Sequence, residues 1–390
     1  MISVEEALSH IFDLVSPVGV ETVPLAEAAG RVLAAPVRAR RTQPPFAASA
    51  MDGYALNGTE AEPHAMFKVI GTAAAGHGFD GHVGPGQAVR IFTGAPVPEG
   101  ATRVIIQEDV TARGDMITLG DALDSGPHIR PAGNDFAEGA TVEPPRRLTP
   151  ADLSLLAAMN IPELPVRRRP VVAIIATGDE LVMPGEEPGP DQIIASNSFG
   201  LKALVEAEGA EARLLPIARD TRASLETVFG LAEGADLILT SGGASVGEHD
   251  LVGDVAAGLG MEQSFYKVAM RPGKPLMAGR MGDAAMIGLP GNPVSALVCG
   301  HVFVRPALRA MLGLGAAPAP RHKGALAAPI GANGPREHYM RAQITPGGLS
   351  VFDRQDSALL SVLAAADALV IRPPHDGPRG AGEAVEYLTL

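Results

Sequence analysis

Tryptophan is absent from this sequence of 390 residues, and aromatic residues make up only 4% of it. Proteins that bind single-stranded nucleic acid commonly stack its bases on aromatic side chains, so we do not expect that function. Lysine and arginine together number 31, against 44 aspartate and glutamate residues, which gives a net charge of −13. Because so acidic a chain has no broad basic face, neither nucleic acid nor an anionic membrane is expected as a partner.

Cysteine occurs once, at Cys299, which excludes an intramolecular disulfide and leaves too few thiolates for a cysteine-ligated metal site. No run of 18 apolar residues is present, so no membrane span is expected. The first ten residues, MISVEEALSH, are acidic and lack the apolar core of a secretory signal. There is also no Walker A pattern and no H-x-x-x-H pair. These absences predict a soluble, cytoplasmic protein.

Glycine (46 residues) and proline (34 residues) are abundant, which predicts many turns and short elements. A capping box at Ser3–Glu6 predicts a helix over 3–15, and Thr149-Pro150 starts a second helix that should end near Asn160. Between these helices, strands are predicted at 67–71, 88–92 and 104–107. We therefore expect a small β domain (41–131) inserted into a helical linker domain (1–40 and 132–169).

From residue 171 the pattern changes to alternating strands and helices. The run Val171–Ala176 is continuously apolar, which is typical of a strand buried on both faces. Further strands are predicted at 213–217 and 236–240, and helices at 197–208, 221–232 and 293–311. This alternation favours a three-layer α/β domain (170–316) with a mostly parallel sheet. Short runs at 325–328, 340–344 and 368–371 predict a C-terminal β domain (317–390), which completes a multidomain α/β fold.

Three polar loops follow predicted strands, at 177–180, 220–222 and 240–250. Ligands of open parallel sheets bind beyond the carboxyl ends of the strands. In the third loop, Gly242, Gly243 and Gly247 permit close backbone approach, and Ser241 and Ser245 add hydroxyl donors, a combination suited to phosphate. Asp250 either caps the next helix or holds a metal, and the residues leave both possibilities open.

A basic cluster comes next in an otherwise acidic chain. Only five lysines are present, and two of them, Lys267 and Lys274, flank Arg271 within eight residues. Such a concentration of positive charge suits a phosphorylated ligand or an oxyanion, although a solvated turn is the alternative. In the following segment 288–296, Asn292 fits a helix N-cap and Pro293 fits the first helical turn. Taken alone, that segment is better explained as a rigid strand-to-helix turn.

Eight segments, in one order along nearly the whole chain, resemble the molybdopterin molybdenumtransferase family, which includes MoeA and the E domains of gephyrin and plant proteins. They are SAMDGYA (49–55), RIFTGAPVPEGA (90–101), RPAGND (130–135), ATGDEL (176–181), SNS (196–198), TSGGASVGEHD (240–250), RPGKP (271–275) and GLPGNPVSA (288–296). Two positions depart from the family pattern: Arg271 stands where lysine is more usual, and Asp356 where glycine is commoner.

The resemblance implies an elongated homodimer in which the inserted β domain of one subunit helps to close the active site of the other. It also implies a set of site residues. These are Asp52, Thr93, Arg130 and Asp135 from the N-terminal half; Glu180, Asp220, Asp250, Lys267 and Arg271 from the α/β domain; Pro290 and Pro293 in the wall; and Arg341 and Ser361 from the last domain.

The reaction implied is that of molybdate with adenylylated molybdopterin, giving molybdenum cofactor and AMP. The amides of 241–247 would hold the pyrophosphate, with Mg²⁺ on Glu180 and Asp250. Arg271, Lys274 and Lys267 would neutralise molybdate, and Asp220 or Asp250 would orient the attacking oxygen. A molybdopterin adenylyltransferase is a candidate partner. The alternatives are a molybdopterin adenylyltransferase-like enzyme, a nucleotide-pyrophosphate hydrolase, or a non-enzymatic scaffold of the gephyrin type.

Overall fold

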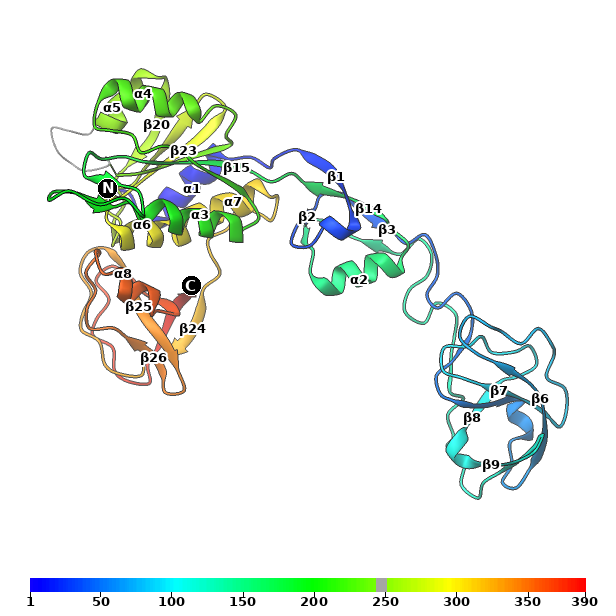
Figure 1. Cartoon of the computed structure of the whole chain (residues 1–390). Helices are drawn as coiled ribbons and strands as arrows, with labels where there is room; N and C mark the ends of the chain where they lie inside the picture. Colours follow the sequence, from blue (N-terminus) through cyan, green and yellow to red (C-terminus); the bar gives the residue numbers. More distant parts are fainter. Residues whose placement is uncertain (243–250) are drawn as a thin grey trace.

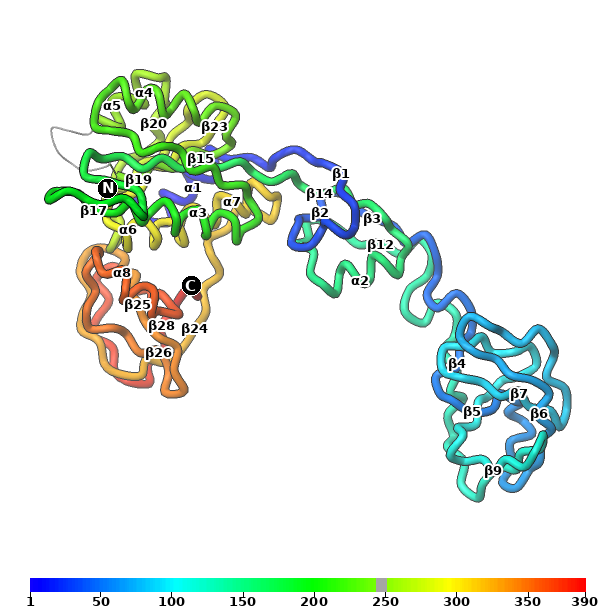
Figure 2. Tube along the Cα trace, in the orientation of Figure 1, coloured from blue at the N-terminus to red at the C-terminus, as the bar shows by residue number. Residues whose placement is uncertain are grey.

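The computed structural model describes residues 1–242 and 251–390, and its shape is elongated (Figure 1). An α/β domain lies at one end with the C-terminal β domain beside it. A slender arm leads from them to the inserted β domain at the other end (Figure 2). The expected multidomain α/β architecture is therefore present.

The α/β domain is built on one six-stranded sheet. Its strand order is β18 (Glu211–Leu214), β15 (Val171–Ala176), β19 (Leu237–Ser241), β23 (Ala284–Leu289), β22 (Met277–Met281) and β20 (Met261–Tyr266). The first four strands are parallel, and β22 and β20 form an antiparallel edge. The mostly parallel sheet is thus confirmed, although β18 begins two residues before the strand predicted at 213–217.

Helices cover both faces of this sheet, as predicted. One face carries α3 (Asn197–Ala207), α6 (Pro293–Cys299) and α7 (Arg305–Met311), and the other carries α4 (Arg222–Leu231) and α5 (Leu251–Gly258). In β15, Val172 and Ile174 join the first core, whereas Ala173 and Ile175 join the second. This alternation explains why the strand is apolar at every position.

Helix α1 (Val4–Leu14) begins with the predicted capping box, in which Ser3 and Glu6 bond to each other's backbone N–H. Its apolar face does not pack with the second helix of the expected linker domain. Instead Val4, Leu8 and Ile11 belong to the core of the α/β domain, where α1 contacts β20, β22 and α7. The sequence shows that this face is apolar but not which surface it covers.

The arm is mostly strand rather than helical. Its four-stranded sheet has the order β1 (Val20–Pro24), β14 (Glu163–Arg167), β2 (Val32–Leu33) and β13 (Arg146–Arg147), and β3 (Val37–Arg38) pairs with β12 (Thr141–Val142). The helix α2 (Pro150–Ala158) packs on it and is capped by Thr149 as predicted. The expectation of a helical linker holds only for this helix, because the short strands carry weak periodicity.

The inserted domain is a six-stranded sheet, and its three predicted strands are confirmed as β6, β7 and β8. The order is β8 (Arg103–Ile106), β5 (Gly53–Leu56), β7 (Gln87–Ile91), β6 (Met66–Ala73), β10 (Met116–Leu119) and β9 (Val110–Arg113). A separate pair, β4 (Ala48–Ser49) and β11 (Ile129–Arg130), lies where the chain enters and leaves the domain.

The C-terminal domain is a β sheet that includes one strand from outside it. The order is β21 (Met270–Arg271), β25 (Glu337–Thr345), β27 (Ala368–Arg372), β28 (Ala384–Thr389) and β24 (His322–Ala325), with β26 (Gly348–Val351) on β25. The strand predicted at 325–328 is wrong, because β24 ends at Ala325. Strand β21 carries Arg271, so the basic cluster is joined by backbone pairing to this domain.

The long helix predicted at 293–311 is present but interrupted. A π-helical segment, η4 (Gly300–Val304), separates α6 from α7. By length and composition the run could cross a membrane, but 78% of its most apolar window is buried inside the structure. The core helix of a globular domain has the same composition, so this run is weak evidence for a membrane span.

Candidate active site

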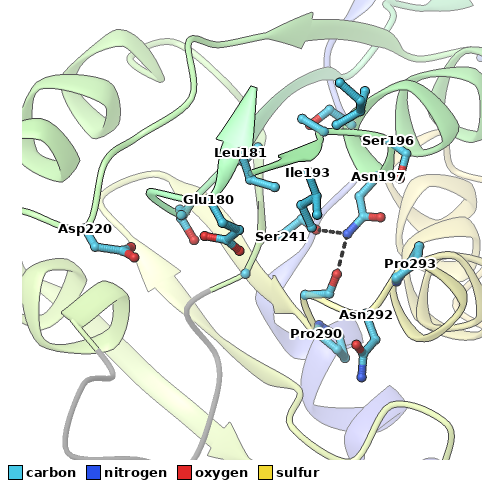
Figure 3. Close-up of a pocket in the computed structure, with 18 of the residues that line it drawn as sticks. Glu180, Leu181, Ile193, Ser196, Asn197, Asp220, Ser241, Pro290, Asn292 and Pro293 are labelled. Atoms are coloured by element: carbon cyan, nitrogen blue, oxygen red, sulfur yellow. Dashed lines mark hydrogen bonds between the residues drawn. The ribbon is translucent and has the colours of Figure 1, made fainter. Parts of the chain in front are cut away.

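A cavity of about 980 Å³ opens at the carboxyl ends of β15, β19 and β23 (Figure 3). This is where the sequence predicted a ligand site from the strand-end loops. Six of the predicted site residues line it: Glu180, Asp220, Ser241, Gly242, Pro290 and Pro293. Gly243, Ser245 and Asp250, which were also predicted, lie outside the described residues.

The ends of β15 and β19 approach each other so closely that one glycine is required. The Thr177 N–H donates to the Ser241 carbonyl at 3.1 Å. Gly242 has φ of +107°, and a Cβ there would stand 2.5 Å from the Thr177 carbonyl oxygen. The glycine predicted for close backbone approach is therefore confirmed at 242.

Asn197, at the start of α3, ties two of these loops together (Figure 3). Its side-chain Nδ2 donates to Ser241 Oγ at 2.8 Å and to the Gly291 carbonyl at 2.7 Å. The segment SNS matched the family pattern, but its asparagine was not among the predicted site residues. A single asparagine in a predicted helix gives no sign of the partners that the fold brings to it.

Three carboxylates line the cavity. Glu180 and Asp220 were predicted, and Asp254 in the first turn of α5 was missed. None of the three side chains has a hydrogen-bond or ion-pair partner among residues 1–242 and 251–390. An aspartate in a first helical turn is common, because it complements the helix dipole, so nothing in the sequence singles out Asp254.

These carboxylates are the side chains in the cavity that could be ligands of the expected magnesium ion. Within the described part of the chain, no group of three ligand side chains is arranged to hold a metal. Mg²⁺ usually takes one or two carboxylates, with water and substrate phosphate oxygens completing its shell. The donors present fit an ion held in that way, jointly with a phosphorylated ligand.

The turn before α6 forms another wall of the cavity. Pro293 occupies the first helical turn as predicted. Asn292 is the N-cap residue as predicted, although its side chain makes no capping hydrogen bond among the described residues. Its side chain borders the cavity instead. The Val294 N–H donates to the Ser357 carbonyl of the C-terminal domain at 3.1 Å, which closes the wall from the other side.

The basic cluster lies beside the cavity, at the seam with the C-terminal domain. Pro275 and Ala358 line the cavity from the two sides of this seam. Arg271 and Lys274 are exposed. Lys267 has φ of +69°, and its Nζ stands 4.8 Å from the centroid of the Tyr266 ring. The cluster is thus next to the cavity and does not line it.

Arg341, on β25, is fully buried, with 0% of its surface exposed. Its Nη2 donates to the Arg354 carbonyl at 3.3 Å, but Nε and Nη1 have no partner among the described residues. Burial lowers the pKa of Arg341, Asp356 raises it, and Arg271 lowers it further. A buried guanidinium beside a second arginine, with donors unused, would be stabilised by an oxyanion. Ser361, on α8 (Leu360–Ala364), is exposed.

Two histidines, the buried His338 and the half-buried His301, predict that this protein loses stability in mild acid. Burial lowers the pKa of His301 to about 4, helped by Arg305. Burial also lowers the pKa of His338 to about 4, with Arg271 and Arg341 adding to the effect. The unfolded chain protonates both histidines near pH 6.5, so it binds more protons than the folded chain below that pH. Stability present above pH 6.5 should fall toward pH 4, by about 1.4 kcal/mol per pH unit for each histidine.

Urea unfolding at several pH values between 6.5 and 4.5 measures this slope. Replacing both histidines by asparagine should flatten it, whereas the same change at the exposed His77 should leave it unchanged. An unaltered slope in the His301→Asn/His338→Asn variant would show that other groups cause the acid sensitivity.

In the inserted domain, the predicted residues Asp52 and Thr93 form a pair. Asp52 Oδ1 accepts from the Thr93 N–H at 2.7 Å and from its hydroxyl at 2.8 Å. These bonds, and the charge of Arg90, hold the pKa of Asp52 below its usual value. Asp52 is therefore a fixed, ionised carboxylate. The other two predicted residues of this half, Arg130 and Asp135, are exposed where the domain joins the arm.

Within one chain these residues are far from the cavity. The inserted domain lies at the end of the molecule opposite the α/β domain (Figure 1). The predicted residues thus form two groups, one at each end of the molecule, and the two groups do not meet within a single subunit.

Three family models cover most of the chain. The MoeA N-terminal region (domain I and II) matches residues 2–160, a probable molybdopterin binding domain matches 173–310, and the MoeA C-terminal region (domain IV) matches 323–390. Their boundaries follow the arm with its inserted domain, the α/β domain and the C-terminal domain.

Relatives and solved structures agree with these matches. The molybdopterin molybdenumtransferase of Haemophilus influenzae is 38% identical over 84% of this chain and 82% of its own. Molybdopterin molybdenumtransferase 2 of Mycobacterium tuberculosis is 38% identical over 88% and 87%. The crystal structure of a molybdopterin biosynthesis MoeA protein from Pyrococcus horikoshii superposes with a TM-score of 0.87, at 28% identity and full coverage of both chains. The chain belongs to the molybdopterin molybdenumtransferase family.

Proposed function

We propose that this chain transfers molybdate to adenylylated molybdopterin, releasing AMP and forming the molybdenum cofactor. The observation that carries the proposal is the junction of two chemically different regions. One is a cavity with a glycine at a strand end and with carboxylates that have no partner among the described residues. The other is a basic seam with a buried arginine, two nitrogens of which likewise have no partner in the described part of the chain. The first suits a metal-bound pyrophosphate, and the second suits a tetrahedral oxyanion. The names of the relatives agree with this pairing.

The cavity would hold the nucleotide end of the substrate. Ser241 and Gly242 at the end of β19 line it, as does Pro293 in the first turn of α6, and amides of 241–247 would hold the pyrophosphate. Glu180 and Asp250 would hold Mg²⁺, which supplies neutralisation of the charge on the phosphate oxygens. Asp220, which also lines the cavity, would accept a hydrogen bond from the attacking oxygen and so orient it.

The basic seam would hold molybdate. Arg271, Lys274 and Lys267 surround it from the α/β domain, and Arg341 approaches it from β25. Nε and Nη1 of this guanidinium have no partner among the described residues, so an oxyanion that reached them would meet donors that are not already bonded. Ser361 would add a hydroxyl donor from α8.

A second copy of the chain would complete the site. Asp52 and Thr93 belong to the inserted domain, and Arg130 and Asp135 lie where that domain joins the arm. The inserted domain is at the end of the molecule opposite the cavity, so in a homodimer these residues would reach the partner's cavity (Figure 1). Pro290 and Pro293 would shape the wall that meets them. We further propose that the protein is cytoplasmic and receives its substrate from a molybdopterin adenylyltransferase.

The deciding experiment is AMP release from adenylylated molybdopterin with Mg²⁺, measured against molybdate concentration. Molybdate-dependent release, with a product that activates an apo-molybdoenzyme, is the expected result. Release without molybdate would identify a nucleotide-pyrophosphate hydrolase instead. ATP-dependent formation of the adenylylated pterin would identify an adenylyltransferase, and tight pterin binding without release would identify a scaffold.

A further inference from the structure

Arg219 lies outside the cavity lining but is bonded to the loop that carries Glu180. It follows Ala218, which forms an isolated β-bridge with Thr177, and it precedes α4. Its Nη1 donates to the carbonyl oxygens of Asp179 and Leu181, each at 3.0 Å, and lies 3.4 Å from that of Gly178. These three carbonyls flank Glu180 on both sides. One exposed guanidinium therefore fixes the backbone immediately around a cavity-lining carboxylate.

The bonding between the two loops is reciprocal. The Asp220 N–H donates to Asp179 Oδ1 at 3.1 Å, and the Gly178 N–H donates to the Ala218 carbonyl at 3.0 Å. The loop of Glu180 thus holds the backbone of Asp220, and the loop of Asp220 holds the backbone of Glu180. Neither backbone segment can shift without disturbing the other.

Glu180 itself is fixed in its backbone and free in its side chain. Its carbonyl accepts from the Ile193 N–H at 2.7 Å. Its carboxylate folds over Gly178, where an added Cβ would stand 2.2 Å from Oε2. The arrangement holds the backbone that carries the carboxylate, while the carboxylate oxygens have no partner among the described residues.

We propose that Arg219 is a positioning residue for the carboxylates Glu180 and Asp220. The inference rests on the proposed function, because Arg219 acts through residues to which that function assigns roles. Arg219 is exposed, so its loss should disturb global stability little. A displacement of about 1 Å in a catalytic group, however, can lower a rate by roughly 10²-fold.

The test compares Arg219→Ala and Arg219→Lys with a matched control, Arg222→Ala. Arg222 lies three residues further on, is also exposed, and pairs only with Glu226 among the described residues, at 3.6 Å. Three quantities are measured: hydrogen exchange of the amides of Gly178 and Asp220, kcat for AMP release, and the Mg²⁺ concentration for half-maximal rate.

In Arg219→Ala, we expect exchange of both amides to rise about tenfold, because the opening of a loop governs exchange there. We also expect kcat to fall roughly tenfold or more, and half-saturation to need more Mg²⁺. Arg219→Lys should restore part of each loss, as should added guanidinium ion with the alanine variant. Arg222→Ala should match the wild type in all three quantities.

Two results would overturn the inference. Exchange in Arg219→Ala equal to that in Arg222→Ala would show that the bonds do not hold the loops. Faster exchange with unchanged kcat and Mg²⁺ dependence would show a structural role alone. A wild-type protein without AMP release would instead refute the proposed function. Exchange at Gly178 and Asp220, with and without Mg²⁺ and AMP, would then decide separately whether Arg219 orders a metal-binding loop.

Discussion

Replacing Glu180 by glutamine is expected to lower kcat for AMP release by about 10²–10³-fold, the range found for loss of one charge-stabilising group in other enzymes. The side chain is exposed and has no partner among the described residues, so the change should not affect folding. Glutamine keeps the size of the side chain but removes the negative charge. The lower kcat would therefore reflect weaker binding of Mg²⁺ and weaker stabilisation of the charge that develops at the phosphoanhydride.

The matched control is Glu187→Gln, made at an exposed glutamate that follows β16 (Leu181–Val182) and has no partner in the described part of the chain. Both variants should keep the thermal midpoint of the wild type, and the control should also keep its kcat. Single-turnover measurement of AMP release separates the chemical step from product release. A kcat for Glu180→Gln within twofold of the control would remove Glu180 from the mechanism.

Glu180→Gln, combined with a second variant at Asp52, also tests whether two chains build one site. Asp52→Asn should also be nearly inactive, because it removes the fixed charge held by Thr93. If Asp52 acts in the partner's cavity, a mixed dimer contains one intact site and one doubly altered site. Exchanging subunits between the two variants should then restore roughly a quarter of wild-type activity, as random pairing in a two-fold dimer dictates. Sites formed within single chains would give no recovery.

The sequence predicted best where local pattern determines structure. The capping box at Ser3, the helix start at Thr149-Pro150, the apolar strand Val171–Ala176 and the polar loops after the parallel strands all depend on neighbouring residues. Parallel strands bring their carboxyl ends to one edge of a sheet, so residues far apart in the chain could be assigned to one cavity. Glu180, Asp220 and Ser241 were found in this way, and all three line it.

Prediction failed where the outcome depends on contacts between distant segments. The apolar face of α1 gives no indication that it covers the α/β sheet and not the arm. The pairing of β21 with β25, which joins the basic cluster to the last domain, has no pattern in either strand. Arg219 is one of many exposed arginines in the sequence. Its partners are carbonyl oxygens, which every residue has, so nothing in the sequence distinguishes it.

A second large effect, on the molybdate dependence of the rate, is expected from a substitution at the seam between the α/β and C-terminal domains. Arg341→Met should raise the molybdate concentration for half-maximal rate by about 10–100-fold, the effect of losing roughly 1.5–3 kcal/mol from a charged hydrogen bond. Thermal stability should stay the same or rise, because an apolar side chain replaces a buried cation with two unpaired nitrogens. A rise in thermal stability together with weaker molybdate binding would show that Arg341 serves ligand binding and not folding. A fall in stability with unchanged molybdate dependence would show that it supports the fold instead.

Removing the charge of Asp356 should strengthen molybdate binding, which is the opposite of the effect expected for Arg341→Met. It is the neighbouring carboxylate that raises the pKa of Arg341, and it therefore competes for the guanidinium with any bound oxyanion. In Asp356→Asn the side-chain oxygen can still accept from the Ala358 N–H, now 2.8 Å away, so the turn before α8 should persist. Removing the charge should lower the half-saturating molybdate concentration by about two- to fivefold, as expected for a partly screened charge pair. If Asp356→Asn raised that concentration, Asp356 would have to help place Arg341, and the electrostatic account of the seam would be wrong.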